Sequence, residues 1–441
     1  MLTWLALCTI AALLVLILFR ITSVLVALTL VPVAAALLGG FGGQIGTFAM
    51  DGIRGVTPVA ALLAFAVVYF GVMNDAGLFE PIIRTLVRVM GRDPVKIAVG
   101  TAAIAAVAHL DGAGASTFMV TVPAMLPLYR SVRMSPLVLT CTTALAAGTM
   151  NMLPWGGPTT RAAASLQVSA ASLFAPVVPA MIAGMIAVFL FAVQIGRQER
   201  LRLARLPAPP DTPLAPDADS RDAVAETTAD SARSPLGAMW YFNALLTAAT
   251  LVVLFTELVP LALVFLFASA IALLVNYPDP RAQRDRLTAH GSAAMVMVTT
   301  IFAAGVFTGI LTKSGMLGSL STDLVRALPD GVLRHLPALM GVASMPLSLA
   351  FDPDSFYFGL LPILAGASQA AGGSAIEVGR AATLGQMTTG FPVSPLTPAT
   401  FLLVGLAEVD LADHQRRTIP YAFAVSVIMT IVALATRAIG T

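Results

Sequence analysis

Two acidic turns in this chain each separate a pair of short apolar segments. The first turn begins at Asp111, and the second contains Asp352 and Asp354. Each flanking apolar arm is shorter than the about 20 residues that a helix needs to cross a bilayer. The arms therefore predict two re-entrant hairpins, over residues 95–130 and 335–372, whose tips stop near mid-membrane. A carboxylate at that depth must be buried in protein or face a wet cavity, so two such tips indicate a transport site.

The three tip acids and one histidine are the candidate proton or metal sites. Asp111 can carry a proton or bind a metal ion, and it can also cap the second hairpin arm, because aspartate accepts backbone N–H groups well. His109 precedes it in the same arm and is either a satisfied structural side chain, a proton relay or a metal ligand. Asp352 and Asp354 flank Pro353. Such a pair holds a divalent cation, shares a proton or simply shapes the turn.

Two further apolar segments are interrupted by turn-forming residues. The interruptions run from Met150 to Thr159 and from Thr388 to Pro398, and both combine several prolines with glycine and hydroxyl residues. Proline removes a backbone donor and glycine adds conformational freedom, so both stretches are predicted to be unwound. Free N–H groups and positive helix ends suit substrate carboxylates, whereas free carbonyls suit cations.

Candidate substrate-binding residues gather at the hairpin tips and at these interruptions. They are Gly114, Ser116, Thr117, Asn151, Gly156, Gly157, Thr159, Arg161, Ser355, Thr389, Ser394 and Thr397. Arg161 has two interpretations: its guanidinium binds a carboxylate of the substrate, or it neutralises an acid such as Asp111. The set as a whole favours an anion with many hydrogen-bonding groups, carried together with a coupling cation.

The composition places these features in a membrane. The chain has 441 residues, of which 58% are hydrophobic and 11% charged, and its mean hydropathy is +0.88. Soluble proteins have about 25% charged residues. The net charge of +2, without a basic run interleaved with aromatics, gives no sign of nucleic acid binding. We predict an all-α polytopic protein surrounded by membrane lipids.

One long polar stretch, residues 197–236, divides the chain into two halves, residues 1–196 and 237–441. The stretch opens with arginines and continues with a Pro-, Asp- and Ala-rich composition. Such a segment cannot bury enough apolar area to fold, so it predicts a disordered cytoplasmic linker.

The two halves resemble each other in sequence order. Gly77 and Gly315 lie in similar segments 238 positions apart, and the same offset relates Pro154 to Pro392. Each half is predicted to hold its hairpin and five spanning segments, one of them discontinuous. The segments are residues 2–19, 22–40, 57–79, 135–168 and 173–196, then 237–256, 258–276, 290–312, 376–407 and 417–438. An odd number of crossings puts the halves in opposite orientations, which is the inverted-repeat plan of many transporters.

The basic residues support one orientation. With the central linker in the cytoplasm, that side also holds Arg20, Arg84, Arg88, Arg92, Lys96, Arg130, Arg133, Arg281, Arg284, Arg286, Arg416 and Arg417. The opposite side holds Arg54, Lys313, Arg326, Arg334 and Arg437. By the positive-inside rule, both termini then face outward and the two hairpins enter from opposite sides.

Three motifs resemble those of the bacterial citrate-metal:proton symporters, the CitMHS family of the ion transporter superfamily. They are His109-Leu110-Asp111-Gly112-Ala113-Gly114-Ala115-Ser116-Thr117-Phe118, Asn151-Met152-Leu153-Pro154-Trp155-Gly156-Gly157-Pro158-Thr159 and Phe351-Asp352-Pro353-Asp354-Ser355-Phe356-Tyr357. The resemblance extends over nearly the whole chain. It implies proton-driven uptake, across the bacterial inner membrane, of citrate complexed with Mg²⁺ or Ca²⁺. The divalent cation is then part of the transported complex, and no covalently bound cofactor is expected.

Sodium-coupled dicarboxylate transporters of the same superfamily carry Ser-Asn-Thr at their hairpin tips. This chain has Gly-Ala-Ser-Thr at the first tip and Pro-Asp-Ser at the second. That departure fits protons or a metal ion better than sodium. By resemblance to those relatives we expect a homodimer in which a transport domain, built from hairpins and broken helices, slides against a fixed scaffold in an elevator mechanism.

Other functions compete with this one. A proton-coupled carrier of another carboxylate or oxyanion would use the same scaffold. An intramembrane aspartyl protease also needs two membrane aspartates, but the Tyr-Asp and Gly-x-Gly-Asp motifs of that class do not occur in the sequence. We therefore predict a transporter rather than an enzyme, and alternating access rather than a channel, because broken helices in inverted repeats favour it. The choice between Mg²⁺ and Ca²⁺ stays open, because both prefer oxygen ligands.

Overall fold

The computed structural model describes residues 1–19, 21–206, 237–256 and 258–440. Within these ranges all regular secondary structure is helical and no strand occurs, which confirms the predicted all-α class. Residues 197–204 of the expected linker belong to a helix rather than to a disordered segment. The rest of the linker, from residue 207 to 236, lies outside the described residues.

Proline begins several helices of the first half, because its fixed φ suits the first turn and its missing N–H is not needed there. Pro94 follows the Asp93 cap of α5 (Pro94–Ala108), and Pro136 follows the Ser135 cap of α7 (Pro136–Met150). The helices are, in order, α1 (Leu2–Leu18), α2 (Val24–Leu38), η1 (Gly42–Gln44), α3 (Ile45–Asp75), α4 (Glu80–Met90), α5 (Pro94–Ala108), η2 (His109–Asp111), α6 (Gly114–Ser131), α7 (Pro136–Met150), α8 (Gly157–Leu166), α9 (Ala170–Phe174), η3 (Ala175–Val177) and α10 (Val178–Ala204).

The second half repeats much of this order, with a π-helical segment directly after the acidic turn. The helices are α12 (Ala238–Thr256), α13 (Leu261–Asn276), α14 (Pro280–Lys313), α15 (Met316–Ala327), α16 (Asp330–Arg334), α17 (Leu336–Leu347), the π-helix η5 (Ser355–Leu360), α18 (Leu361–Ala370), α19 (Ala375–Thr383), α20 (Pro398–Leu406) and α21 (Leu411–Ala435).

Both predicted interruptions are present. Irregular backbone separates α7 from α8 and α19 from α20. Three predicted segments, 57–79, 290–312 and 417–438, were wrong at their boundaries, since the helices there begin earlier, at Ile45, Pro280 and Leu411. The helices α4 and α15, which follow the first two of these helices, had no counterpart in the predicted segments, because their mixed apolar and charged residues do not form a membrane-length apolar run.

Five stretches of the described residues are long and apolar enough to cross a membrane. They are Gly42–Asp75, Pro94–Asp111, Ala170–Ala204, Pro280–Lys313 and Leu411–Ala435. The second of them is the first arm of the first hairpin, which has 18 residues when η2 is included. Six further apolar helices are shorter, so the full set of ten crossings and the re-entrant character of the hairpins stay predictions.

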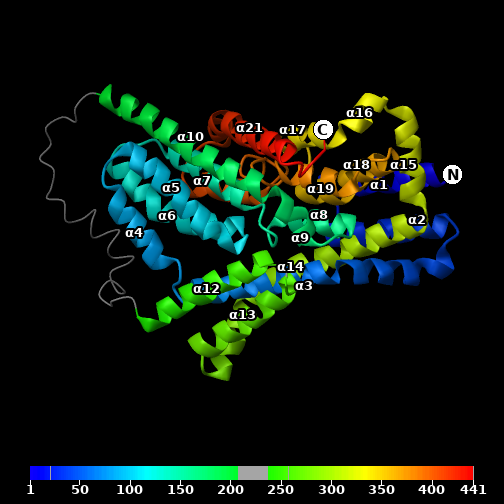
Figure 1. The fold of residues 1–441 in the computed structure, drawn as a ribbon, viewed down its shortest axis with the longest axis horizontal. Helices are drawn as coiled ribbons and strands as arrows, with labels where there is room; N and C mark the ends of the chain where they lie inside the picture. The colour runs from blue at the N-terminus through cyan, green and yellow to red at the C-terminus, as the bar shows by residue number, and fades with distance from the viewer. Residues whose placement is uncertain (20, 207–236, 257, 441) are drawn as a thin grey trace, which may run out of the picture.

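Each hairpin packs against the broken helices of both halves. The second arm of the first hairpin, α6, packs against α7 and also against α20, whereas α18 of the second hairpin packs against α19 and also against α8. Figure 1 shows α5 and α6 toward one end of the molecule, α15 and α18 toward the other, and α8, α9 and α19 between them. This reciprocal packing brings both acidic tips to the unwound stretches.

The helices α3 and α14 lie antiparallel, with their backbones in contact (Figure 1). Gly52 of α3 meets Gly309 of α14, and Gly71 of α3 meets His290 of α14. The offset of 238 residues between the halves exchanges these two contacts, because it relates Gly71 to Gly309 and Gly52 to His290. A two-fold relation between the halves would produce this pattern, which therefore supports the predicted inverted repeats.

The contact between α3 and α14 allows no side chain at Gly52. A Cβ there would lie 1.9 Å from the carbonyl oxygen of Gly305. Since that atom belongs to a backbone, Gly52→Ala is expected to destabilise the protein by about 1–3 kcal/mol, the usual cost of overpacking. Thermal unfolding of the purified protein in detergent measures this. Gly291→Ala, on α14, is the matched control, because nothing lies within 4 Å of a Cβ at that position. Equal unfolding temperatures for the two variants would contradict the prediction.

Candidate functional site

Asp111 closes the turn of the first hairpin. Its Oδ1 accepts a hydrogen bond from the backbone N–H of Ala113 at 2.8 Å, and its Oδ2 accepts one from the hydroxyl of Ser116. The following glycine, Gly112, takes φ +71°, a left-handed conformation that favours glycine. Asp111 thus closes the turn before α6, and the predicted cap on the second arm is wrong, because the first residues of α6 receive no side-chain cap. Asp111 and Ser116 also line a small cavity with Asn74 of α3, so the carboxylate is not sealed into the turn.

His109 lies deep beside the same tip. The side chain is fully buried, and its Nδ1 is 2.7 Å from the hydroxyl of Thr117. Its ring stacks on Phe391 with centroids 5.9 Å apart, and Phe391 stacks in turn on Phe118 at 6.0 Å. The Nε2 atom has no hydrogen-bond partner among the described residues; Asn151 approaches the ring without meeting hydrogen-bond geometry. The histidine therefore presents one unsatisfied polar atom to the interior.

The first unwound stretch, residues 151–156, holds its shape through its own backbone. Thr159 donates to the carbonyl oxygen of Met152 at 2.7 Å. A Cβ on Gly156 would lie 2.0 Å from the carbonyl oxygen of Asn151, so glycine is required where the chain enters α8. The indole N–H of Trp155 donates to the carbonyl oxygen of Leu110 at 2.8 Å and ties the stretch to the first hairpin.

The two unwound stretches contact each other at Met387. The side-chain amide of Asn151 donates to the carbonyl oxygen of Met387 at 2.7 Å. A Cβ on Gly157 would meet the Met387 side chain at 2.5 Å. Met387 itself has φ +54°, which is uncommon for a residue with a Cβ. Residues of the first and second halves thus form one continuous site.

The second unwound stretch, residues 384–397, is buried and polar. Ser394 donates to the carbonyl oxygen of Ser348 in the second hairpin at 2.6 Å. The hydroxyls of Thr389 and Thr397 are buried and have no hydrogen-bond partner in the described part of the chain. These two hydroxyls and His109 Nε2 are unsatisfied polar atoms at predicted site residues, so each is available to a polar ligand or to water.

The acids of the second tip have separate partners. Asp352 accepts from the backbone N–H groups of Asp354 and Ser355, at 3.0 and 3.1 Å, and from the Ser355 hydroxyl at 2.5 Å. Asp354 instead pairs with Arg161 of α8, whose Nε lies 2.7 Å from Oδ1. Asp352 therefore shapes the turn, and Arg161 lies beside Asp354 rather than beside Asp111.

A preformed metal cage is not part of this arrangement. Across the described residues, no three His, Cys, Asp or Glu side chains converge in a way that would hold a metal ion. The predicted proton or metal residues are distributed over two tips, with His109 and Asp111 at one and Asp352 and Asp354 at the other. A cation that is carried as part of a complex needs fewer protein ligands than a resident one, because the partner anion supplies the others.

Three helices begin at the site without a side-chain cap. They are α6 at Gly114, α8 at Gly157 and α20 at Pro398. Gly114 is also close to Phe391, since a Cβ there would meet that ring at 2.9 Å. The first N–H groups of a helix have no partner within the helix and carry a positive dipole end. These termini add anion-binding capacity to the unsatisfied hydroxyls.

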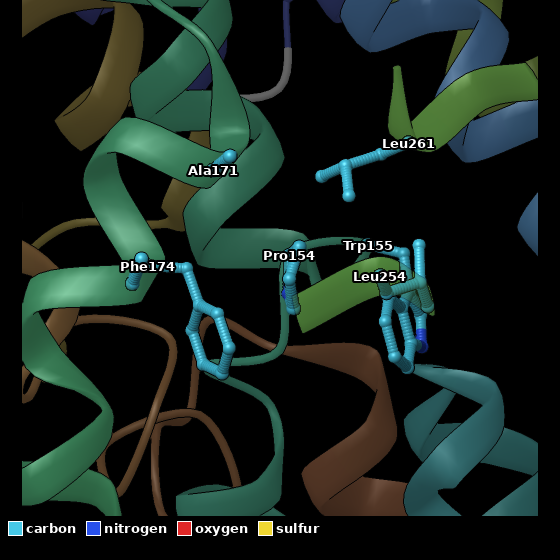
Figure 2. A pocket seen from close by; sticks show the side chains of 7 residues that line it. Pro154, Trp155, Ala171, Phe174, Leu254 and Leu261 are labelled. Atoms are coloured by element: carbon cyan, nitrogen blue, oxygen red, sulfur yellow. The ribbon is translucent and has the colours of Figure 1, made fainter. Parts of the chain in front are cut away.

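A separate pocket beside the first unwound stretch is apolar. It is lined by Pro154, Trp155, Ala171, Phe174, Ala175, Leu254 and Leu261. Figure 2 shows these side chains around the pocket, with Leu254 and Leu261 coming from the second half. The Trp155 N–H is already used by Leu110. A polyanion would lose its hydration there without gaining partners, so this pocket is not the candidate site.

Sequence reasoning did not include Gln386, Met387 or Phe391 in the site. Gln386 accepts from the hydroxyls of Ser348, through its side chain, and of Tyr357, through its backbone. Phe391 lies inside the second proline-containing interruption, and that position was a usable signal for it. Met387 precedes the predicted interruption, and nothing in its local sequence indicates a left-handed conformation.

Comparison with known proteins places this chain among citrate transporters. A family model described as a citrate transporter, CitMHS, matches residues 2–385. A citrate transporter of Bacillus subtilis (strain 168) is 42% identical over 412 residues, which cover 93% of each chain. The Mg(2+)/citrate complex secondary transporter of the same organism is 38% identical over 419 residues, 95% of this chain and 94% of its own.

Solved structures share the fold at lower identity. The YdaH transporter of Alcanivorax borkumensis has a TM-score of 0.60 and 15% identity, with 89% of this chain and 88% of that chain covered. MtrF of Neisseria gonorrhoeae has a TM-score of 0.59 and 13% identity, with 92% and 86% covered. These likenesses show the helical transporter fold alone. The family match over most of the chain, together with the two Bacillus relatives, shows that the chain belongs to the CitMHS family of citrate transporters.

Proposed function

We propose that this chain takes up citrate as a complex with Mg²⁺ or Ca²⁺, by proton symport, across the bacterial inner membrane. The observation that carries the proposal is the group of buried polar atoms without partners, His109 Nε2 and the hydroxyls of Thr389 and Thr397, beside uncapped helix termini. Such a site suits a ligand with several carboxylates and a hydroxyl. One relative carries the name of a Mg(2+)/citrate complex secondary transporter, which supports the metal complex as cargo.

Asp111 is the proposed proton carrier. Its carboxylate is one of the two tip acids that are not paired with a basic side chain, and it borders a small cavity. Asp352, the other such acid, accepts three hydrogen bonds from its own turn. A protonated Asp111 reduces the charge that must be moved through the membrane.

The proposed cycle is an elevator. The hairpins α5–α6 and α17–α18 and the broken helices pack on one another and would move together, while α3 and α14, whose backbones are in contact, would form part of the scaffold. The distribution of basic residues supports a cytoplasmic linker with both termini outside. A homodimer is proposed on the sequence resemblance.

A second candidate is a proton-coupled carrier of another carboxylate or oxyanion. The hydroxyls and helix termini that favour citrate offer the same hydrogen bonds to any polycarboxylate. Competition of labelled citrate uptake by tricarballylate, gluconate and succinate separates these substrates.

Uptake of labelled citrate into proteoliposomes tests the leading proposal. We expect uptake to require Mg²⁺ or Ca²⁺ and to rise when the outside is more acidic than the lumen, because protons enter with the complex. Removal of the divalent cation with EDTA, and separately collapse of the pH gradient with a protonophore, should each reduce uptake. Uptake that responds to neither treatment would disprove the metal and proton parts of the proposal.

A further inference from the structure

One ion pair joins the two halves at the site. Arg161 of α8 and Asp354 of the second hairpin lie 2.7 Å apart, and their side chains are 22% and 18% exposed. The pair therefore has limited contact with solvent, yet it is not sealed from it. Breaking a pair of this kind leaves a poorly solvated charge, which costs more than breaking a surface pair.

Both members of the pair have unused binding capacity. In the described structure, Asp354 Oδ2 has no donor, and the second terminal nitrogen of Arg161, Nη2, has no acceptor. The other contacts of the guanidinium are long, at 3.4 Å to the carbonyl oxygen of Gly157 and 3.6 Å to the sulfur of Met387. By contrast, both oxygens of the neighbouring Asp352 accept hydrogen bonds from the turn itself.

We propose that this ion pair selects metal-bound citrate over free citrate by exchanging partners with it. A carboxylate of citrate takes the guanidinium of Arg161, and the divalent cation of the complex takes the carboxylate of Asp354. The inference rests on the proposed function and assigns the choice of substrate form to two residues.

The selection follows from charge. Free citrate that binds Arg161 leaves Asp354 without a positive partner and adds further negative charge beside it, which a site of limited solvation disfavours. The metal complex brings an anionic and a cationic end, so both residues regain a partner of opposite charge. Mg²⁺ and Ca²⁺ both accept a single protein carboxylate when other oxygens complete their coordination. The exchange therefore requires the cation without requiring a protein metal cage.

Binding of labelled citrate to the purified full-length protein tests this, with citrate supplied either with Mg²⁺ or with EDTA. Wild-type protein is expected to prefer the Mg²⁺ form. Asp354→Asn is expected to reduce that preference about tenfold or more, because no carboxylate then needs the cation; a tenfold change corresponds to about 1.4 kcal/mol. Asp354→Glu, which restores a carboxylate, is expected to recover the preference. Glu408→Gln is the matched control. It breaks an exposed ion pair with Arg130, whose nitrogen and the Glu408 oxygen are 2.8 Å apart, and this pair lies away from the site.

The outcomes separate this inference from the proposed function. Wild-type protein that binds citrate equally with Mg²⁺ and with EDTA would overturn both. Wild-type protein that prefers the complex, while Asp354→Asn keeps the same preference, would overturn only the role of the ion pair. A variant Asp354→Asn that fails to fold is replaced by Asp354→Ser, and a folded Asp354→Ser that keeps the wild-type preference overturns the inference equally.

Discussion

Asp111→Asn is expected to abolish the accumulation of citrate that a pH gradient drives. The substitution removes the carboxylate that borders the small cavity at the first tip, whereas the neighbouring His109 is fully buried with its Nδ1 against the hydroxyl of Thr117. Asparagine carries no proton between the two sides of the membrane, so net uptake is no longer linked to proton movement. We expect gradient-driven accumulation to fall by at least about tenfold for each pH unit of gradient, because that gradient supplies about 1.4 kcal/mol per proton and the neutral asparagine no longer couples it to uptake.

The substitution keeps the turn. The side-chain oxygen of asparagine still accepts from the N–H of Ala113, which the aspartate now bonds at 2.8 Å. The single proton of the Ser116 hydroxyl has an alternative acceptor in the carbonyl oxygen of Ala113 at 2.9 Å, so the hydroxyl keeps a partner without the carboxylate. Asparagine is itself a good residue at a helix start. The folded protein, and with it citrate binding, should therefore survive.

Two assays on the same proteoliposomes check this prediction. Uptake against a citrate gradient at several pH differences reports coupling, whereas exchange of internal for external citrate needs no net proton movement. Asp111→Asn should lose the first and keep the second. Asp323→Asn, at an exposed side chain of α15, is the control and should keep both. Accumulation by Asp111→Asn that still follows the pH gradient would move the coupling site to another acid.

The local features of the site could be predicted from sequence. Gly112 after Asp111 indicated a turn, and clustered prolines indicated the interruptions before α8 and α20, because proline and glycine act on the backbone where they stand. The repeat offset also predicted the order of elements in the second half. Each of these signals depends only on residues near one another in the chain.

The partners within the site could not be predicted in this way. The contact between Asn151 and Met387 joins residues 236 positions apart, and the stack of His109 on Phe391 joins two different halves. Asp352 and Asp354 look equivalent in sequence. Only the packing of α8 against the second hairpin decides that Asp354 meets Arg161, while Asp352 turns back to its own backbone.

Arg161→Lys is expected to reduce citrate uptake by roughly ten- to a hundredfold although the charge is kept. That range corresponds to the loss of one hydrogen bond to a charged group, about 1.5–3 kcal/mol. A guanidinium can release Asp354 and engage a substrate carboxylate through two parallel hydrogen bonds, because its donors form a rigid fork. An ammonium is a compact point charge on a flexible stem, so it cannot reproduce this paired contact.

Comparing Arg161→Lys with Arg161→Gln separates the effect of the guanidinium geometry on uptake from the effect of its charge. Arg161→Gln removes the charge as well and is expected to lose more uptake than Arg161→Lys, and both should reduce the apparent affinity for the Mg²⁺ complex. Arg54→Lys, on a side chain that is 74% exposed on α3, is the control and should transport as wild type. Full activity in Arg161→Lys would mean that only the positive charge matters. The bidentate geometry would then be irrelevant, and a single point charge would be enough for Arg161 to exchange Asp354 for the citrate carboxylate.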